Sequence, residues 1–208
     1  MTIRKGEPWG SVVAAPPHLP VFDNERECHG MIERSFGAGP AERIGIGLRA
    51  GDLARTMGGG TPRRFEGDVV CAPVDVLRVT LDGVVHHALA HVVLRRSRRL
   101  GWLRGRVVLA MNAQYLGAHD VAPRSHPNDG RVDVIDIGSS MSVRSRLQAR
   151  ARSESGTHLP HPDIAVASVQ RWQVKFERLQ RCWVDGRFVG SACTVEIEVL
   201  PDALQVYA

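Results

Sequence analysis

The chain has 208 residues, 43% of them hydrophobic and 24% charged, which is the composition of a globular protein that can bury a sizeable core. Its formal net charge of +5 and sequence pI of about 9.5 allow an anionic partner without identifying one. No apolar run approaches the roughly 20 residues that span a bilayer, and the first residues lack the apolar core of a signal peptide, so we expect a cytoplasmic protein. The four cysteines are scattered without a C-x-x-C pair, which is typical of reduced thiols.

The first third of the chain alternates short strands with helices. Asn24 is a good helix N-cap, and Glu27, three residues later, completes a capping box. Four elements are expected in order: a buried strand over 11–15, a helix over 24–36, a strand over 43–47 and a helix over 50–57. This order predicts a small α/β unit over residues 1–68, too short for a complete nucleotide-binding domain.

From Val69 onward the pattern changes to strands. Asp82-Gly83 and Asp185-Gly186 are turn signals between apolar runs, and Ser139 or Ser140 is expected to cap a helix that runs to about Arg152. The expected strands cover 74–81, 84–94, 107–111, 132–137, 164–169, 172–176, 182–184, 188–189, 194–199 and 204–207. Short strands with frequent turns predict a β-sandwich over residues 69–208, and an α+β fold for the whole chain.

One stretch carries several polar signals in order. Asn112, Tyr115 and Gly117 form N-x-x-Y-x-G, an Ala-Pro follows, and Asp129 and Asp133 lie in D-G-x-x-D-V. This combination resembles the diacylglycerol-kinase and sphingosine-kinase family of lipid kinases, where the segment opens the second, β-rich domain. The resemblance extends over residues 44–207.

The resemblance implies that Asp185 is catalytic. W-V-D-G-R-F-V-G and the later P-D-A-L-Q-V are similar to the family's D-G-E turn and following strand, which hold the general base. A carboxylate in such a turn can orient and deprotonate an acceptor hydroxyl during phosphoryl transfer. Arg187 replaces the family's glutamate. The alternative is that Asp185 only fits a tight hairpin turn.

Two further sites are implied by the resemblance. Asp129 and Asp133 resemble a structural Mg²⁺ site, since hard cations take carboxylate and carbonyl oxygens; the alternative is a solvated turn. G-L-R-A-G-D-L-A-R-T-M-G resembles the nucleotide motif P-L-G-T-G-N-D-F-A-R-x-L-G, with Asp52 and Arg55 retained. Gly51 stands where the family has asparagine, and the alternative reading is a capped helix start.

The family's glycine-rich phosphate loop has no counterpart in the expected position. Residues 13–19 read V-A-A-P-P-H-L there, and two prolines remove N–H donors and fix φ. The chain therefore resembles a lipid kinase whose nucleotide domain is truncated. A homodimer or a partner chain could supply the missing part.

A basic segment over residues 95–106 mixes arginines with apolar side chains. Such a mixture suits an anionic lipid surface or nucleic-acid phosphates; the alternative is a solvated loop. Only two of the 27 basic residues are lysines, a ratio that GC-rich codon usage also produces. The residues expected to contact anionic lipid or phosphate are Arg95, Arg96, Arg98, Arg99 and Trp102.

The resemblance implies ATP- and Mg²⁺-dependent phosphoryl transfer to a lipid hydroxyl. The alternative function is a catalytically inactive module that binds a lipid or a membrane surface, which would place the protein at the periphery of the membrane. No recognisable motif supports nucleic-acid binding. His86, His87 and His91 are expected on one strand, in packing roles.

Overall fold

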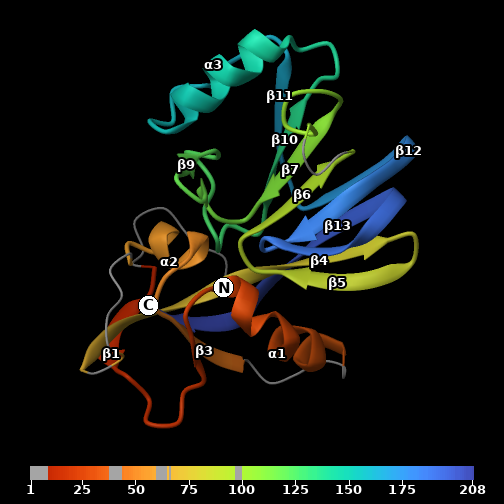
Figure 1. Ribbon diagram of the computed structural model, residues 1–208. Helices are drawn as coiled ribbons and strands as arrows, with labels where there is room; N and C mark the ends of the chain where they lie inside the picture. Colours follow the sequence, from red (N-terminus) through yellow and green to blue (C-terminus); the bar gives the residue numbers. More distant parts are fainter. Residues whose placement is uncertain (1–8, 38–43, 60–64, 66, 97–99) are drawn as a thin grey trace.

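The computed structural model describes residues 9–37, 44–59, 65, 67–96 and 100–208 (Figure 1). Within them, eleven strands form one sheet whose main path runs β1-β4-β13-β12-β6-β7-β10-β11. The N-terminal elements are β1 (Ser11–Ala14), β2 (Val21–Phe22), α1 (Glu25–Gly37), β3 (Ile44–Leu48) and α2 (Asp52–Thr56). The remaining elements are β4 (Asp68–Leu81), β5 (Val84–Ala88), β6 (His91–Arg95), β7 (Val107–Met111), β8 (Tyr115–Leu116), β9 (His119–Asp120), β10 (Val132–Ile137), α3 (Val143–Ser153), β11 (Ile164–Val169), β12 (Arg171–Val184) and β13 (Arg187–Tyr207).

The long strands fold the sheet over an apolar interior. Buried side chains from β4, β5, β6, β7, β10, β12 and β13 all pack into one core. Alternation along each strand then supplies a second buried face: Val108 and Ala110 of β7 face the interior, whereas Leu109 and Met111 pack beneath α3. The predicted α+β fold with a β-sandwich is confirmed.

The N-terminal elements join the same sheet. β3 pairs in parallel with β13, and β2 pairs in parallel with β3, so β2-α1-β3-α2 forms a small α/β unit against the end of β13. Its helices cover a separate core with Ile46 and Leu204. The predicted strand over 11–15 exists as β1, but it is not buried: it pairs antiparallel with β4 at the sheet edge, and Val12 is 68% exposed. The domain boundary at residue 68 stays a prediction.

The observed helix caps agree only in part with those predicted from the sequence. Asn24 caps α1, since its Oδ1 accepts from the Arg26 N–H, but Glu27 accepts from the Asp23 N–H and not from Asn24 itself. For α3 the prediction of Ser139 or Ser140 is wrong, because the Ser142 Oγ accepts from the Ser145 N–H at 3.1 Å. No helix in the described part of the chain is long and apolar enough to cross a membrane.

Asp75, which is completely buried on β4, connects three segments of the sandwich. Its carboxylate accepts from the Gly130 N–H at 2.7 Å and from the Asp202 N–H at 2.9 Å. Its own N–H donates to the Pro127 carbonyl. One side chain therefore fixes the loop before β10 and the irregularity within β13 onto β4.

We predict that Asp75→Ala lowers the free energy of unfolding by about 2–5 kcal/mol, because it removes the acceptor of the buried Gly130 N–H and of the partly buried Asp202 N–H. Urea denaturation at pH 7 measures the loss. Asp68→Ala, at an exposed position on the same strand, is the matched control, with an expected change within about 0.5 kcal/mol. Equal effects of the two substitutions would contradict the anchoring role of Asp75.

Candidate functional site

Asp185 begins the two-residue turn between β12 and β13, with φ of 46°. Its carboxylate is buried and accepts three backbone hydrogen bonds, from Leu89 at 2.8 Å, Ala90 at 2.9 Å and His91 at 3.0 Å. These donors explain why the strand predicted over 84–94 is wrong. The chain breaks into β5 and β6 at Leu89-Ala90, so that consecutive N–H groups turn toward one carboxylate.

Asp82-Gly83, another Asp-Gly turn of the sandwich, has the same local geometry as Asp185-Gly186. Asp82 has φ of 45°, and its carboxylate accepts from the Cys193 and Thr194 N–H groups. Bonding an adjacent strand is therefore a general property of these turns. Asp185 differs from Asp82 in its surroundings, which contain other ionisable groups.

Asp52 at the start of α2 lies beside Asp185. Its Oδ1 accepts from the Gly117 N–H at 2.9 Å, and its Oδ2 lies 3.4 Å from Nδ1 of His91, an ion-pair distance without hydrogen-bond alignment. Burial raises the pKa of Asp52 and the charge of Asp185 adds to the effect, while His91 and the Gly117 N–H oppose it. Two residues predicted from separate motifs, Asp52 and Asp185, thus lie in one cluster.

Arg55, the other residue predicted to bind nucleotide, contacts neighbouring residues of the protein. Its Nη1 donates to the Gly117 carbonyl at 3.0 Å, and its guanidinium lies 3.8 Å from the centre of the Tyr115 ring. Arg55 therefore holds the β8–β9 hairpin against α2. A role in nucleotide binding stays a prediction.

Glu25 also belongs to this cluster, although no pattern in the sequence indicated it. This first residue of α1 is buried, and its Oε1 accepts from the Leu53 N–H at 2.6 Å. Burial raises the pKa of the Glu25 carboxyl to about 7, and the charges of Asp185 and Asp52 contribute. A Cβ at Gly51, whose φ is 104°, would overlap the Glu25 carboxylate. Glycine at position 51, where the family has asparagine, is thus explained by the space that Glu25 occupies.

The strand-to-helix turn, where a phosphate loop would be expected, lies between β2 and α1 and not at the position predicted from the sequence. β1 pairs antiparallel with β4, whereas β2 is parallel to β3 and leads directly into α1, so the strand-to-helix turn lies at Phe22–Glu25 and not at residues 13–19. That turn contains no glycine. The Asp23 N–H of this turn is bonded to Glu27, and the Arg26 N–H in the first turn of α1 is bonded to Asn24. Neither this turn nor the start of α2, where Glu25 binds Leu53, fits a nucleotide phosphate.

His91 differs from the other two histidines predicted on its strand. His86 and His87 lie on β5 and contact Glu33 of α1; the Nδ1 of His87 is 3.0 Å from that carboxylate. The break after β5 separates them from His91, which faces Asp52. The prediction of all three on one strand is therefore wrong.

Asp129 and Asp133 interact electrostatically at the loop before β10. Burial raises the pKa of Asp129 to about 6, and the charges of Asp133 and Asp75 contribute; its Oδ1 also accepts from the Arg131 N–H. Across the described ranges, no group of three or more histidine, cysteine, aspartate or glutamate side chains is placed to hold a metal ion. Two carboxylates are present for Mg²⁺, and the site stays a prediction.

The residues predicted to contact anionic lipid lie in different environments. Arg95 is buried, with its guanidinium 4.3 Å from the centre of the Trp183 ring and 4.9 Å from that of Trp102. Arg96 is exposed, and Arg98 and Arg99 lie outside the described residues. Trp102 lines a cavity beneath α3. Arg95 is therefore placed for packing and not for surface contact.

The cavity has a volume of about 250 Å³ and is mainly apolar. α3 covers it on one side, and strands β7, β10 and β11 lie on the other (Figure 1). Arg146 of α3 does not offer its charge there, because its guanidinium donates to the carbonyls of Gly105 and Gly138 at 2.6 Å and to that of Met141 at 3.1 Å. The apolar lining includes Trp102, Leu103, Leu109, Leu116, Ile135 and Met141.

The β8–β9 hairpin separates this cavity from the carboxylate cluster. Leu116 and His119 line the cavity, while the adjacent Gly117 binds Asp52. An apolar chamber and a cluster of carboxyls, of which Glu25 and Asp185 are buried and Asp52 is half-buried, thus lie on two sides of one short hairpin.

We predict that Glu25→Gln changes the pH dependence of stability. A folded pKa of about 7, against an ordinary value of 4.5, means that the folded state holds a proton the unfolded state releases. The stabilisation is complete below pH 4.5 and is lost as the pH rises through about 7. Relative to wild type, the variant should gain roughly 2–3 kcal/mol between pH 5 and pH 8.

Urea unfolding of both proteins at several pH values measures this gain. Glu27→Gln, two residues along α1 at an exposed position, is the control and should follow the wild-type curve. Parallel curves for Glu25→Gln and wild type would show that Glu25 does not titrate in this range.

Residues 73–208 match the family described as the YegS C-terminal NAD kinase beta sandwich-like domain. The solved structures similar to this chain include "Crystal structure of a putative diacylglycerol kinase from Bacillus anthracis str. Sterne", with a TM-score of 0.59, 13% identity and coverage of 79% of this chain and 69% of that one. Another, described as a diacylglycerol kinase from the same organism, has a TM-score of 0.51, 15% identity and coverage of 79% and 66%. At these identities the likeness concerns the fold.

No protein with a curated description matches the chain. The family match nevertheless spans well over half of the sequence, and it includes the Asp185 turn and the strands around the cavity. The chain therefore belongs to the family of the YegS C-terminal NAD kinase beta sandwich-like domain, a bacterial lipid-kinase-like family.

Proposed function

We propose that the protein binds a lipid, with an alkyl chain in the cavity beneath α3 and the polar head toward the β8–β9 hairpin. The observation that carries this proposal is the apolar cavity of about 250 Å³ within the family's sandwich. An apolar cavity of about 150 Å³ is enough for benzene, and typical small-molecule sites begin at roughly 300 Å³. This cavity suits one alkyl chain.

The polar groups of the cavity suit a hydroxyl. His158 is buried and lines the cavity, and burial lowers its pKa, which favours the neutral imidazole. His119 also lines the cavity, with its Nδ1 3.0 Å from the Ser153 Oγ. The Ser153 hydroxyl and the His119 ring can exchange hydrogen bonds with a lipid hydroxyl.

We predict that Ala149→Phe abolishes alkyl binding, because residue 149 lies on the cavity side of α3 and a phenyl ring would fill the space. Trp102 lines the cavity, so a change in tryptophan fluorescence on titration with decanol reports occupancy. Ala151→Phe, on the exposed side of the same helix, should bind as wild type does. The cavity is not the binding site if Ala149→Phe responds to decanol like wild type, or if wild type gives no response.

A second candidate function is phosphoryl transfer to the hydroxyl of the bound lipid, which the gathering of Asp52, His91 and Asp185 favours. Asp185 already accepts three hydrogen bonds, leaving about one of its four acceptor positions for a hydroxyl. Because the turn at Phe22–Glu25 does not fit a phosphate, ATP would have to be held by a second copy or a partner chain. Asp129 and Asp133 are the proposed Mg²⁺ ligands, completed by loop carbonyls and water.

We predict that Asp185→Asn abolishes any transfer of labelled phosphate from Mg-ATP to mixed lipids, and that omission of Mg²⁺ or Asp133→Asn reduces it. Asp82→Asn is the matched control, because it alters an Asp-Gly turn of the same geometry away from the cluster. Equal activity in Asp185→Asn and wild type would exclude Asp185 as the base. Absence of transfer in wild type, with decanol binding intact, would leave lipid binding as the function.

A further inference from the structure

The outer surface of α3 has an amphipathic character of its own. The helix contains four arginines and no acidic residue over Val143–Ser153. At 3.6 residues per turn, Val143, Leu147 and Ala151 lie in one stripe, with Arg144 on one side of it and Arg150 on the other. Val143 is 39% exposed and Leu147 is 52% exposed. We call these five residues the α3 stripe.

The α3 stripe lies at the rim of the cavity. Leu147 and Arg150 belong to the stripe and also line the cavity, so the stripe and the cavity share a border. Arg146, on the inner side of the helix, bonds the carbonyls of Trp102 and Gly105 and holds the turn before β7 against α3. That turn adds Leu100, which is 57% exposed. Exposed apolar side chains of α3 and of this turn therefore lie at the same end of the molecule.

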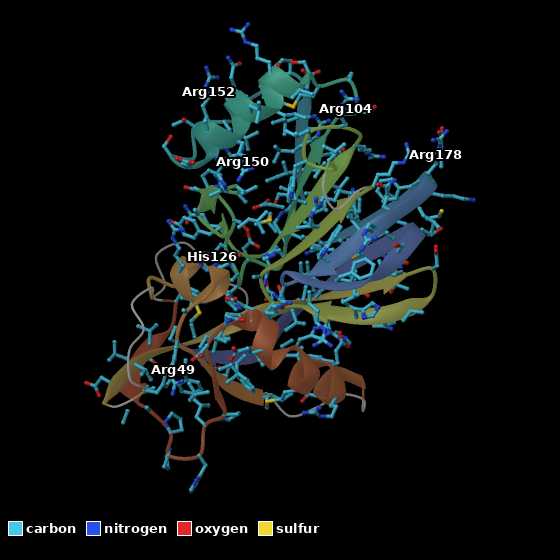
Figure 2. The ribbon with its side chains drawn as sticks, viewed as in Figure 1. Arg49, Arg104, His126, Arg150, Arg152 and Arg178 are labelled. Atoms are coloured by element: carbon cyan, nitrogen blue, oxygen red, sulfur yellow. The ribbon has the colours of Figure 1, made fainter. Side chains whose placement is uncertain are left out.

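Positive charges predominate around the α3 stripe. Figure 2 shows Arg150 and Arg152 on α3 and Arg104 on the neighbouring turn, at the end of the molecule away from Arg49. The first acidic residue after the helix is Glu154, and the acidic residue that acts on α3 electrostatically, Asp163, affects the buried Arg146. Exposed valine and leucine between arginines are typical of a helix that lies in the surface of an anionic bilayer, with the guanidiniums at the phosphates.

We propose that the α3 stripe docks the protein on an anionic membrane, with α3 parallel to the surface and the rim of the cavity at the level of the headgroups. The occupant is a bilayer because arginines flank a narrow apolar stripe; a protein partner would need a larger apolar area. The docking itself does not depend on the proposed function. Its purpose does, because docking would let a lipid pass between the bilayer and the cavity. The α3 stripe lies outside the segment over residues 95–106 that the sequence indicated, and Leu100 and Arg104 of that segment border it.

Sedimentation with vesicles, without nucleotide or added ligand, tests the docking. Vesicles of phosphatidylglycerol and phosphatidylcholine in equal parts should bind the wild-type protein, and pure phosphatidylcholine should bind it much less. The double variant Arg144→Gln, Arg150→Gln should bind the anionic vesicles about thirtyfold more weakly, at roughly fivefold for each arginine. Val143→Glu, which does not line the cavity, should weaken binding at least about tenfold.

The controls remove the same groups from the other end of the molecule. Val12→Glu alters a valine that is 68% exposed on β1, and Arg26→Gln, Arg34→Gln removes two exposed arginines from α1 (Figure 1). Both should sediment like wild type. Docking through α3 is overturned if a control weakens binding as much as its counterpart, if binding ignores lipid charge, or if the α3 variants bind like wild type.

The vesicle experiment and the decanol experiment test the two proposals separately. Val143→Glu should retain the fluorescence response to decanol, and Ala149→Phe should retain vesicle binding while losing that response. If sedimentation velocity shows that Val143→Glu changes the oligomeric state, the α3 stripe binds a second copy of the chain, and membrane docking is overturned. Equal binding of the wild-type protein to vesicles and to DNA at low salt would also count against a lipid surface.

Discussion

The carboxylate of Asp185 fixes the point where β5 ends and β6 begins, 96 residues earlier in the chain. Three consecutive N–H groups can reach one carboxylate only if the strand is interrupted, and the interruption directs His91 toward Asp52. The β12–β13 turn, the start of α2 and the β8–β9 hairpin are thereby brought together. Asp82 makes similar bonds in an exposed turn, so the surroundings of Asp185 and not its local geometry distinguish the site.

The cluster and the cavity have different chemical capacities, and the β8–β9 hairpin connects them. Glu25, Asp52 and Asp185 place three carboxyl groups close together, and burial with mutual repulsion raises the pKa of Glu25 to about 7. On the other side of the hairpin, Leu116 faces a chamber that suits an alkyl chain. A lipid held with its head toward Gly117 would have its hydroxyl near these carboxylates, which is the arrangement that the proposed phosphoryl transfer requires.

The unit formed by β2, α1, β3 and α2 offers few free N–H groups for a nucleotide phosphate, so nucleotide binding has less support than the other features of the family resemblance. N–H groups of the turn at Phe22–Glu25 and of the first turn of α1 are bonded locally, and Glu25 takes the Leu53 N–H at the start of α2. A side chain at position 51 would overlap Glu25, so glycine occupies that position. The Leu53 N–H at the start of α2 is thus bonded to the Glu25 carboxyl and does not donate to a phosphate.

The sequence by itself determined the β-sandwich and the capped helix α1, because alternating apolar residues, caps and turn residues act over a few neighbours. Asp52 and Asp185 were indicated through the family resemblance, as members of two separate sites. Only the tertiary structure decided the break at Leu89-Ala90, the role of Glu25 and the border between cavity and α3. Each depends on contacts between segments far apart in the chain: a strand is interrupted when a distant carboxylate bonds its N–H groups better than a neighbouring strand does, and no local pattern records that competition.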